Sequence, residues 1–225
     1  MKNISLEVPR SLTEIVGDKI RQAILDGDIA LGEMISEERL AQSFGISRTP
    51  VRDALTSMQS TGLIVIRPKR GTFVFRPAEQ DILAISEFRV VMETHAAKLS
   101  YANNKALMLM ALQAAQEEME KAHSDGDFIR YCRYDSTFHE ALFEHCGNDY
   151  IRKSYELASW KIAAIRMEFG RQFSQVREAS VSEHREIINL INKGDFNAVE
   201  ALLKLHVSVL GELSKTMHDL SPSLN

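Results

Sequence analysis

Three histidines and one aspartate are spaced as the ligands of a metal ion would be in a helical protein. Asp135 and His139 lie four residues apart on one expected helix, so their side chains project from the same face. His184 and His206 each lie about eleven residues from a turn at residues 194–195, and therefore reach the same level of an antiparallel hairpin. Imidazoles and a carboxylate suit a divalent transition metal, and leave coordination positions for water or a ligand.

Zinc is the metal that we expect first, with nickel or manganese as alternatives. The competing interpretation is that these residues bind no metal. An isolated helical histidine is usually structural or exposed, and an Asp/His pair four residues apart is common by chance. The remaining histidines have no assigned partner and are expected to be structural or exposed: His95, His123, His145 and His218.

A second set of residues could bind nucleic acid. Ser36 and Gly45 are typical of the start and end of one short helix, and Ser47 is typical of the start of the next. In this second helix the apolar side chains share one face, and Arg48 and Arg52 lie one turn apart on the other. Two helices joined by a short turn, with cations at the start of the second, form a helix-turn-helix pattern.

A basic hairpin is predicted directly after these helices. Residues 63–66 and 72–75 are β-rich runs on either side of Arg67-Pro68-Lys69-Arg70-Gly71, which predicts a wing with a basic tip. Residues 39–76 contain seven Lys and Arg and a single acid, Asp53, so this segment carries +6 in a chain of net charge −4. Such local basicity favours a phosphate-binding surface.

These patterns predict how the chain would contact duplex DNA. Arg48 and Arg52 would reach base edges, preferably guanine, and Thr49 would reach a phosphate or a thymine methyl group. The wing tip would enter the minor groove or follow the backbone. The alternative for the two arginines is an exposed helix face with ion pairs to Asp53 or Glu38. The predicted DNA-binding residues are Arg39, Ser47, Arg48, Thr49, Arg52, Lys69, Arg70 and Gly71.

The sequence predicts a mainly α-helical protein of two domains. We expect a flexible arm over residues 1–9, a winged helix-turn-helix domain over 10–76, a linker over 77–81 and an all-α antiparallel bundle over 82–225. In the bundle the apolar residues recur at helical spacing, with no convincing strand. The predicted helices cover residues 79–102, 104–124, 127–146, 149–170, 174–193 and 195–218.

Composition excludes some classes of protein. No apolar run reaches the roughly 18–20 residues of a membrane span. The first residues include an acid and lack the apolar core of a secretory signal. The two cysteines, Cys132 and Cys146, have no metal-type spacing, so we expect buried reduced thiols. We therefore expect a cytoplasmic protein with no membrane partner.

The N-terminal patterns also resemble the winged-helix signature of the GntR family of bacterial regulators. The segments that carry this resemblance are Leu40-Ala41, Gly45–Arg52, Ala54-Leu55, Gly62-Leu63 and Arg70–Val74. The resemblance implies a homodimer that binds a pseudo-palindromic, double-stranded DNA operator. The chain departs from several members at Glu38, where they carry an arginine that approaches the phosphates.

The helical part resembles the effector-binding FCD domain of the FadR subfamily, in its six-helix, VanR-like form. The segments that carry this resemblance are Arg89-x-x-x-Glu93, Asp135-x-x-x-His139, Gly147-Asn148, Glu183-His184-Arg185, Gly194-Asp195 and Leu205-His206. It implies that all four candidate ligands bind metal, and that the effector is a small organic acid. Arg89 is the candidate cation for the acid, its alternative being an ion pair with Glu93 one turn away. Arg133, Tyr134 and Arg166 are further candidates.

Three functions compete on this evidence. The preferred one is a DNA-binding transcriptional regulator, more often a repressor in this family, whose bundle binds a metal and an organic acid that modulates operator binding. The second is a metal-dependent enzyme with a DNA-binding appendage. It would need an activated nucleophile or base, and His139-Glu140 does not form an HExxH motif, because the next histidine is His145. The third is an architectural DNA-binding protein with a purely structural metal. We expect that the chain is not an enzyme.

Overall fold

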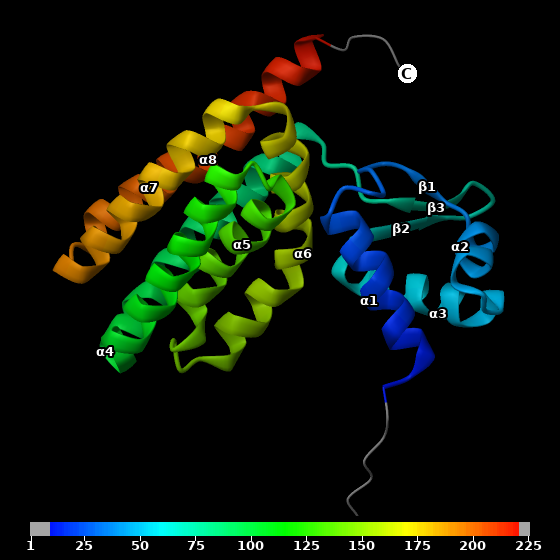
Figure 1. The fold of residues 1–225 in the computed structure, drawn as a ribbon, viewed down its shortest axis with the longest axis horizontal. Helices are drawn as coiled ribbons and strands as arrows, with labels where there is room; N and C mark the ends of the chain where they lie inside the picture. Colours follow the sequence, from blue (N-terminus) through cyan, green and yellow to red (C-terminus); the bar gives the residue numbers. More distant parts are fainter. Residues whose placement is uncertain (1–9, 221–225) are drawn as a thin grey trace, which may run out of the picture. The chain divides into compact units, whose positions relative to one another are not determined.

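The chain folds into two compact units that are joined between Arg76 and Pro77 (Figure 1). The structure is a computed structural model and describes residues 10–220, except for the side chains of residues 172 and 209–220. The arm predicted over residues 1–9 lies outside the described residues. Within residues 10–220, no helix is both long enough and apolar enough to cross a membrane.

The first unit is a winged helix. Its elements are α1 (Leu12–Leu25), β1 (Met34–Ile35), α2 (Glu37–Phe44), α3 (Arg48–Met58), the 3-10 helix η1 (Gln59–Thr61), β2 (Ile64–Arg67) and β3 (Gly71–Val74). The side chain of Ser36 caps α2, and Gly45 ends it in the left-handed conformation, with φ 66°. Ser47 occupies the capping position of α3 as predicted, but its side chain makes no capping hydrogen bond.

The strands form one antiparallel sheet in the order β1-β3-β2. The pair β2 and β3 is the predicted wing, with each strand displaced by one residue from its predicted bounds and Arg67 opposite Gly71. Strand β1 is not predicted by the sequence, because two residues are too few to show alternation. It pairs Met34 with Phe73, and so fastens the loop before α2 to the wing.

The core of this unit determines which face of α3 is exposed. Val51 and Leu55 of α3 are completely buried, as is Ile20 of α1. These contacts hold one side of α3 against α1 and the sheet. The opposite side of α3 carries Arg48 and Arg52, which are exposed. The apolar spacing of α3 therefore determines that its cations face solvent.

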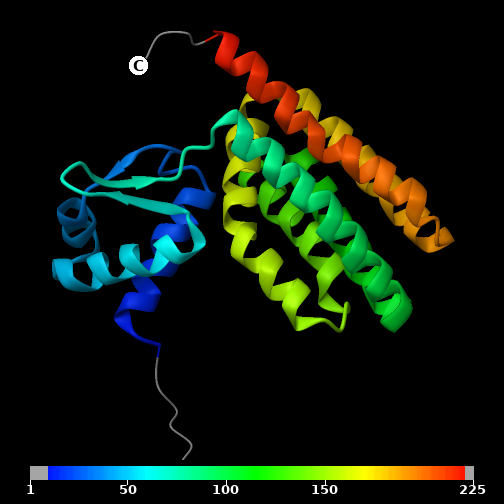
Figure 2. The same ribbon diagram turned by 180° about the vertical axis from the view of Figure 1, so that it is seen from behind.

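The second unit is a bundle of long helices joined by short turns (Figure 2). Its elements are α4 (Glu79–Asp125), α5 (Phe128–Glu144), α6 (Asp149–Gln172), α7 (Ser174–Lys193) and α8 (Phe196–Leu220). Helix α4 packs along α5, α7 and α8, and α6 packs against α5. Phe138 and Leu142 of α5 and Ile187 and Ile191 of α7 are completely buried in the common core. The mainly α-helical class with an N-terminal winged helix is thus confirmed.

The break predicted at residues 103–104 is present as a kink within α4, because Asn104 has non-helical dihedral angles (φ −157°, ψ 75°). One helix boundary differs from the prediction. The break predicted near Gly170 lies at Phe173 instead. Gly170 permits close packing within the helix, because a Cβ atom there would lie 3.1 Å from Cε2 of Phe128.

Replacing Gly170 with alanine should destabilise the bundle. The added methyl group would press on the Phe128 ring, and overpacking of this kind costs about 1–3 kcal/mol of unfolding free energy. Urea denaturation followed by the fluorescence of Trp160, the single tryptophan, measures the loss. The double variant Gly170→Ala/Phe128→Leu should recover part of it. An equal loss in the single and double variants would show that this contact is not the cause.

Candidate metal centre and nucleic-acid interface

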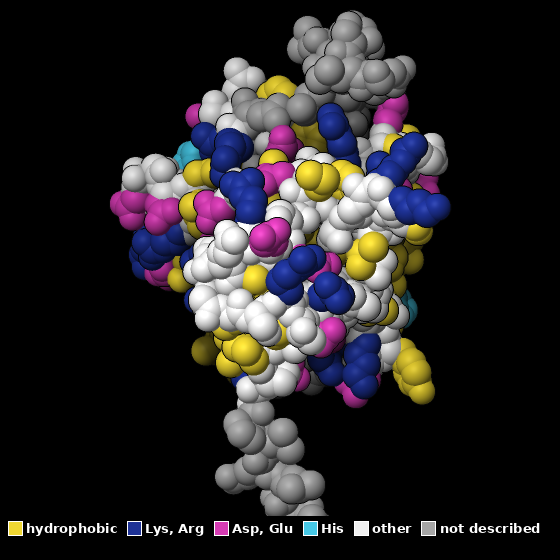
Figure 3. Space-filling model, turned by 90° about the vertical axis from the view of Figure 1, so that its right-hand side faces the viewer, with side chains coloured by type: hydrophobic (Ala, Val, Ile, Leu, Met, Phe, Trp, Pro, Cys, Tyr) yellow, Lys and Arg dark blue, Asp and Glu magenta, His cyan; other side chains and the backbone are white. Residues whose placement is uncertain are grey.

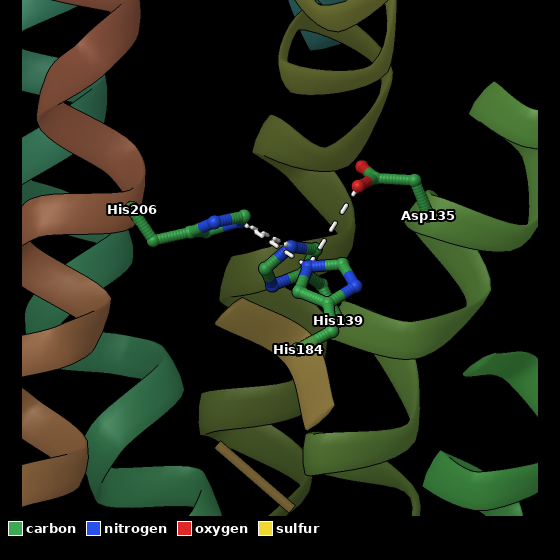
Figure 4. Close-up of side chains that lie close together, drawn as sticks. All are labelled: Asp135, His139, His184 and His206. Carbon is green, nitrogen blue, oxygen red and sulfur yellow. Dashed lines mark hydrogen bonds and ion pairs between the residues drawn. The ribbon is translucent and has the colours of Figure 1, made fainter. Parts of the chain in front are cut away.

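Four side chains from three helices converge inside the bundle (Figure 4). Asp135 and His139 extend from α5, His184 from α7 and His206 from α8. Their potential ligand atoms all lie within 4.8 Å of one another. Nε2 of His206 lies 3.2 Å from Nε2 of both His139 and His184. Nε2 of His184 lies 3.7 Å from Oδ1 of Asp135. The structure therefore brings together all four residues that the helical spacing selected.

Two further carboxylates fix the orientation of the imidazoles. Nδ1 of His139 lies 2.8 Å from Oε2 of Glu93, and Nδ1 of His206 lies 2.7 Å from Oε2 of Glu183. A ring that donates its Nδ1–H to a carboxylate presents an unprotonated Nε2 on its other side. With both rings in that form, the Nε2 lone pairs of His139 and His206 would face each other across 3.2 Å and repel each other. A cation between them would remove the repulsion, so the donor set fits a metal ion.

Packing holds the third imidazole. The His184 ring stacks on Phe138 with centroids 3.9 Å apart and planes inclined by 5°. Burial lowers the pKa of both His139 and His184 well below the usual range, and nearby positive charges lower it further. Burial is the largest single effect and would raise the pKa of Asp135, but the charges of Arg166 and the other basic groups around it together lower the pKa. Neutral imidazoles and an ionised carboxylate are the forms that bind metal.

Two buried arginines flank the cluster in different ways. Arg89 donates from Nε to Oε1 of Glu93 at 2.8 Å, which is its predicted alternative role, and its Nη2 lies 3.2 Å from Nε2 of His139. Arg89 and a metal would therefore compete for that nitrogen. Nε of Arg166 lies 3.0 Å from Oδ2 of Asp135. Its Nη2 is buried and has no hydrogen-bond partner in the described part of the chain. Arg166 therefore has a spare donor.

A small cavity of about 60 Å³ adjoins the cluster. Three arginines and two carboxylates line it beside His206: Arg89, Arg166, Arg177, Asp135 and Glu183. Cys132 also lines it, and burial raises the pKa of its thiol. Both cysteines are free and buried, as the sequence predicts. The cavity therefore suits a small anionic molecule.

The sequence did not predict part of the network around the four-residue cluster. Tyr155 on α6 donates to Oε1 of Glu93 at 3.1 Å, and no pattern suggested this contact. Glu183 contacts His206 on the next helix. Adjacent residues on a helix do not face each other, so the position of Glu183 beside His184 gave no sign of this role. Contacts of this kind depend on how separate helices pack.

All of the predicted DNA-binding residues are exposed side chains or backbone of the winged helix. Arg48 Nη2 and Arg52 Nε both contact the same oxygen, Oε2 of Glu37, at 3.3 and 3.2 Å. The side chains of the alternative partners named above, Asp53 and Glu38, form neither a hydrogen bond nor an ion pair with any described residue. The two arginines are thus ion-paired, but to a carboxylate on the preceding helix.

The wing presents its cations on a constrained turn. Lys69 has φ 62°, a left-handed conformation that is uncommon for residues other than glycine. Gly71 has φ 116°, which side-chain-bearing residues rarely adopt. Lys69 and Arg70 are exposed at this tip. On the face shown in Figure 3, Lys and Arg side chains lie in several groups with acidic side chains between them. The basic surface is therefore interrupted rather than continuous.

Known proteins share both units. The family model described as "Bacterial regulatory proteins, gntR family" matches residues 12–74, and the FCD domain model matches residues 84–209. The HTH-type transcriptional regulator YdhC of Bacillus subtilis is 26% identical over 92% of each chain. The HTH-type transcriptional repressor NanR of Citrobacter rodentium is 25% identical over 94% of this chain and 87% of NanR. The solved structure of E. coli McbR/YncC has a TM-score of 0.79 at 18% identity and covers 93% of this chain and 100% of that one, which shows a shared fold.

A winged helix-turn-helix followed by an FCD bundle defines a bacterial transcriptional regulator. This chain belongs to the gntR family of bacterial regulatory proteins, and its second unit is an FCD domain. Its relatives are transcriptional regulators and not enzymes. The alternative of a metal-dependent enzyme is therefore set aside.

Replacing Glu93 with glutamine should strongly destabilise the metal-free protein. Glu93 is completely buried beside Arg89, which is 2% exposed, so the change leaves a buried guanidinium without its counter-ion. Breaking such a pair costs about 3–5 kcal/mol of unfolding free energy. Urea denaturation in the presence of a chelator measures it. Glu120→Gln, which breaks the exposed pair with Arg185, should cost less than about 1 kcal/mol. Equal losses in the two variants would contradict the role assigned to Glu93.

Proposed function

We propose that the chain is a repressor whose operator binding depends on a divalent metal and a small organic acid held in the bundle. One observation carries this proposal. Three imidazoles and a carboxylate converge beside a cavity that an arginine with a spare donor also lines. Zinc is the preferred metal, because it takes nitrogen and oxygen ligands in such sets, and nickel and manganese are alternatives.

The metal would be held by Asp135, His139, His184 and His206. Glu93 and Glu183 would orient two of these ligands from outside, as carboxylates commonly do for metal-binding histidines. When bound, the metal would supply an open position to which a carboxylate oxygen could bind. The neutral state of the buried histidines supports this assignment.

The effector would be an acid small enough for the cavity. A volume of about 60 Å³ is far below the roughly 300–1,000 Å³ of pockets that take drug-sized ligands. A sugar acid, hydroxy acid or dicarboxylate of few carbons is therefore favoured. Arg166 is the cation that we favour for its carboxylate, because its Nη2 is unpartnered among the described residues. Arg89, the candidate from the sequence, lines the same cavity and would contribute once it leaves His139.

The winged helix would bind DNA as part of a homodimer, with each copy reading one half of a pseudo-palindromic operator. Arg48 and Arg52 would contact base edges. The other predicted residues would contact the backbone or the minor groove: Arg39, Ser47, Thr49, Lys69, Arg70 and Gly71. Repression is inferred from relatives such as NanR, which is a repressor.

Helix α4 offers a physical link between the effector and the DNA-binding unit. The linker predicted over residues 77–81 is mostly the first turn of α4, which begins at Glu79. The same helix carries Arg89 and Glu93 into the cluster. A ligand that moves Arg89 would move α4, and with it the segment that leads to the winged helix. In a dimer this movement would change the spacing of the two reading helices.

Thermal unfolding against a panel of organic acids, before and after chelation, tests the metal and the effector together. An acid at about one hundred times its Kd should raise Tm by roughly 5–10 °C. Chelation and the variant His206→Ala should each abolish the shift, whereas His95→Ala, an exposed position on α4, should retain it. A shift that survives chelation would contradict metal-dependent binding. An acid that raises Tm but leaves DNA affinity unchanged would support the architectural alternative.

Replacing Arg52 with alanine should weaken specific operator binding by roughly 1–3 kcal/mol, because a contact to a base edge is lost. Fluorescence anisotropy with an operator duplex, obtained by selection from random DNA, measures this change. Arg185→Ala removes an exposed cation of the bundle and should leave the affinity as it is. Unchanged affinity in Arg52→Ala would count against the DNA-binding assignment.

A further inference from the structure

One carboxylate oxygen contacts both arginines that face solvent on α3. Oε2 of Glu37 lies 3.3 Å from Nη2 of Arg48 and 3.2 Å from Nε of Arg52. The arginine side chains are 57% exposed and that of Glu37 is 21% exposed. Glu38 is also exposed and in the first turn of α2, but its side chain has no hydrogen bond or ion pair with any described residue. Adjacent acids of the same charge thus differ in their contact with the reading helix.

Fold stability gives a poor account of this contact. Ion pairs between largely exposed side chains contribute little to stability, because water screens them and ordering long side chains costs entropy. Arg48 and Arg52 are one turn apart on α3 and repel each other as like charges. Glu37 offsets that repulsion and restricts both side chains before any DNA is present.

The atoms used decide what each arginine can still do. A guanidinium has five N–H donors, on Nε, Nη1 and Nη2. Arg52 gives Nε to Glu37, so both of its terminal nitrogens remain available. Two parallel terminal donors are what O6 and N7 of guanine accept in the major groove. Arg48 instead contacts the same oxygen through Nη2, one of its two terminal nitrogens, so a base would have to share that nitrogen with Glu37.

We propose that Glu37 is a positioning residue that determines base specificity, by holding Arg52 through Nε so that its two terminal nitrogens face guanine end-on. This inference rests on the proposed function, since it requires operator binding. It has an electrostatic consequence as well. A carboxylate close to the phosphates weakens sequence-independent binding. Glu37 therefore favours operator binding over non-specific binding in two ways. It restricts the side chain of Arg52, and its negative charge opposes sequence-independent binding to DNA.

Selection from a random duplex library, carried out in parallel on the wild type and four variants, tests this inference. The variants are Glu37→Gln, Arg52→Ala, the double variant Glu37→Gln/Arg52→Ala and the matched control Glu38→Gln, which removes the same charge from the next residue. Anisotropy titrations at a fixed salt concentration then compare the affinity for the enriched site with that for random duplex. Thermal unfolding confirms that each variant is folded.

Selection with Glu38→Gln should enrich the same DNA sequence as selection with the wild-type protein. This variant should bind both the enriched site and random duplex more tightly than the wild type does. Glu37→Gln should bind random duplex at least as well as Glu38→Gln does, but its preference for the enriched site should fall by about tenfold, mainly at one guanine. Adding Glu37→Gln to Arg52→Ala should cause little further loss of preference for that guanine, because the Arg52 side chain that contacts it is already absent.

Three outcomes would overturn the inference. If Glu37→Gln keeps the wild-type preference, Glu37 does not position Arg52, although operator binding itself would stand. If Glu37→Gln weakens binding to both duplexes alike, its role is structural. If the wild type enriches no sequence, the proposed function fails and this inference fails with it.

Discussion

The bundle depends on a set of charged and polar groups that it buries together. Arg89 and Glu93 come from α4, Asp135 from α5, Arg166 from α6 and His184 from α7. Removing an ion from water costs several kcal/mol unless a partner of opposite charge meets it. The helices must therefore keep one alignment in which these groups satisfy each other. The apolar core permits such an alignment, but the buried charges select it from the other ways in which similar helices could pack.

The local features of the fold could be predicted because they depend on residues that are close in the chain. Helix α2 begins after Ser36, whose hydroxyl caps it, and ends at Gly45, which has no Cβ to oppose the left-handed conformation. Gly194 ends α7 in the left-handed conformation, with φ 77°. The four candidate metal ligands could also be predicted from the sequence. Helical periodicity determines the direction of each side chain, and a short turn determines which residues of two paired helices lie at the same level.

What the sequence did not predict depends on contacts between elements. Arg52 meets Glu37 across fifteen residues, and the acids beside them in the chain make no such contact. Glu183 reaches His206 on another helix. Gly170 suggests a helix end, but it lies within α6, where the Phe128 ring packs against it. In each case several side chains nearby in the sequence could have made the contact, and only the packing of the helices determines which one does.

The break in α4 has a mechanical consequence. Asn104 interrupts the helical dihedral angles, and the preceding Asn103 is tied to the turn after α5 by hydrogen bonds from its Nδ2 to the carbonyl oxygens of residues 145 and 146. If α4 bends at this point, its first part acts as a lever arm. At about 1.5 Å per residue, Arg89 lies roughly 22 Å from the pivot and Glu79 roughly 37 Å. A sideways displacement at Arg89 is therefore amplified about 1.7-fold where the arm meets the linker.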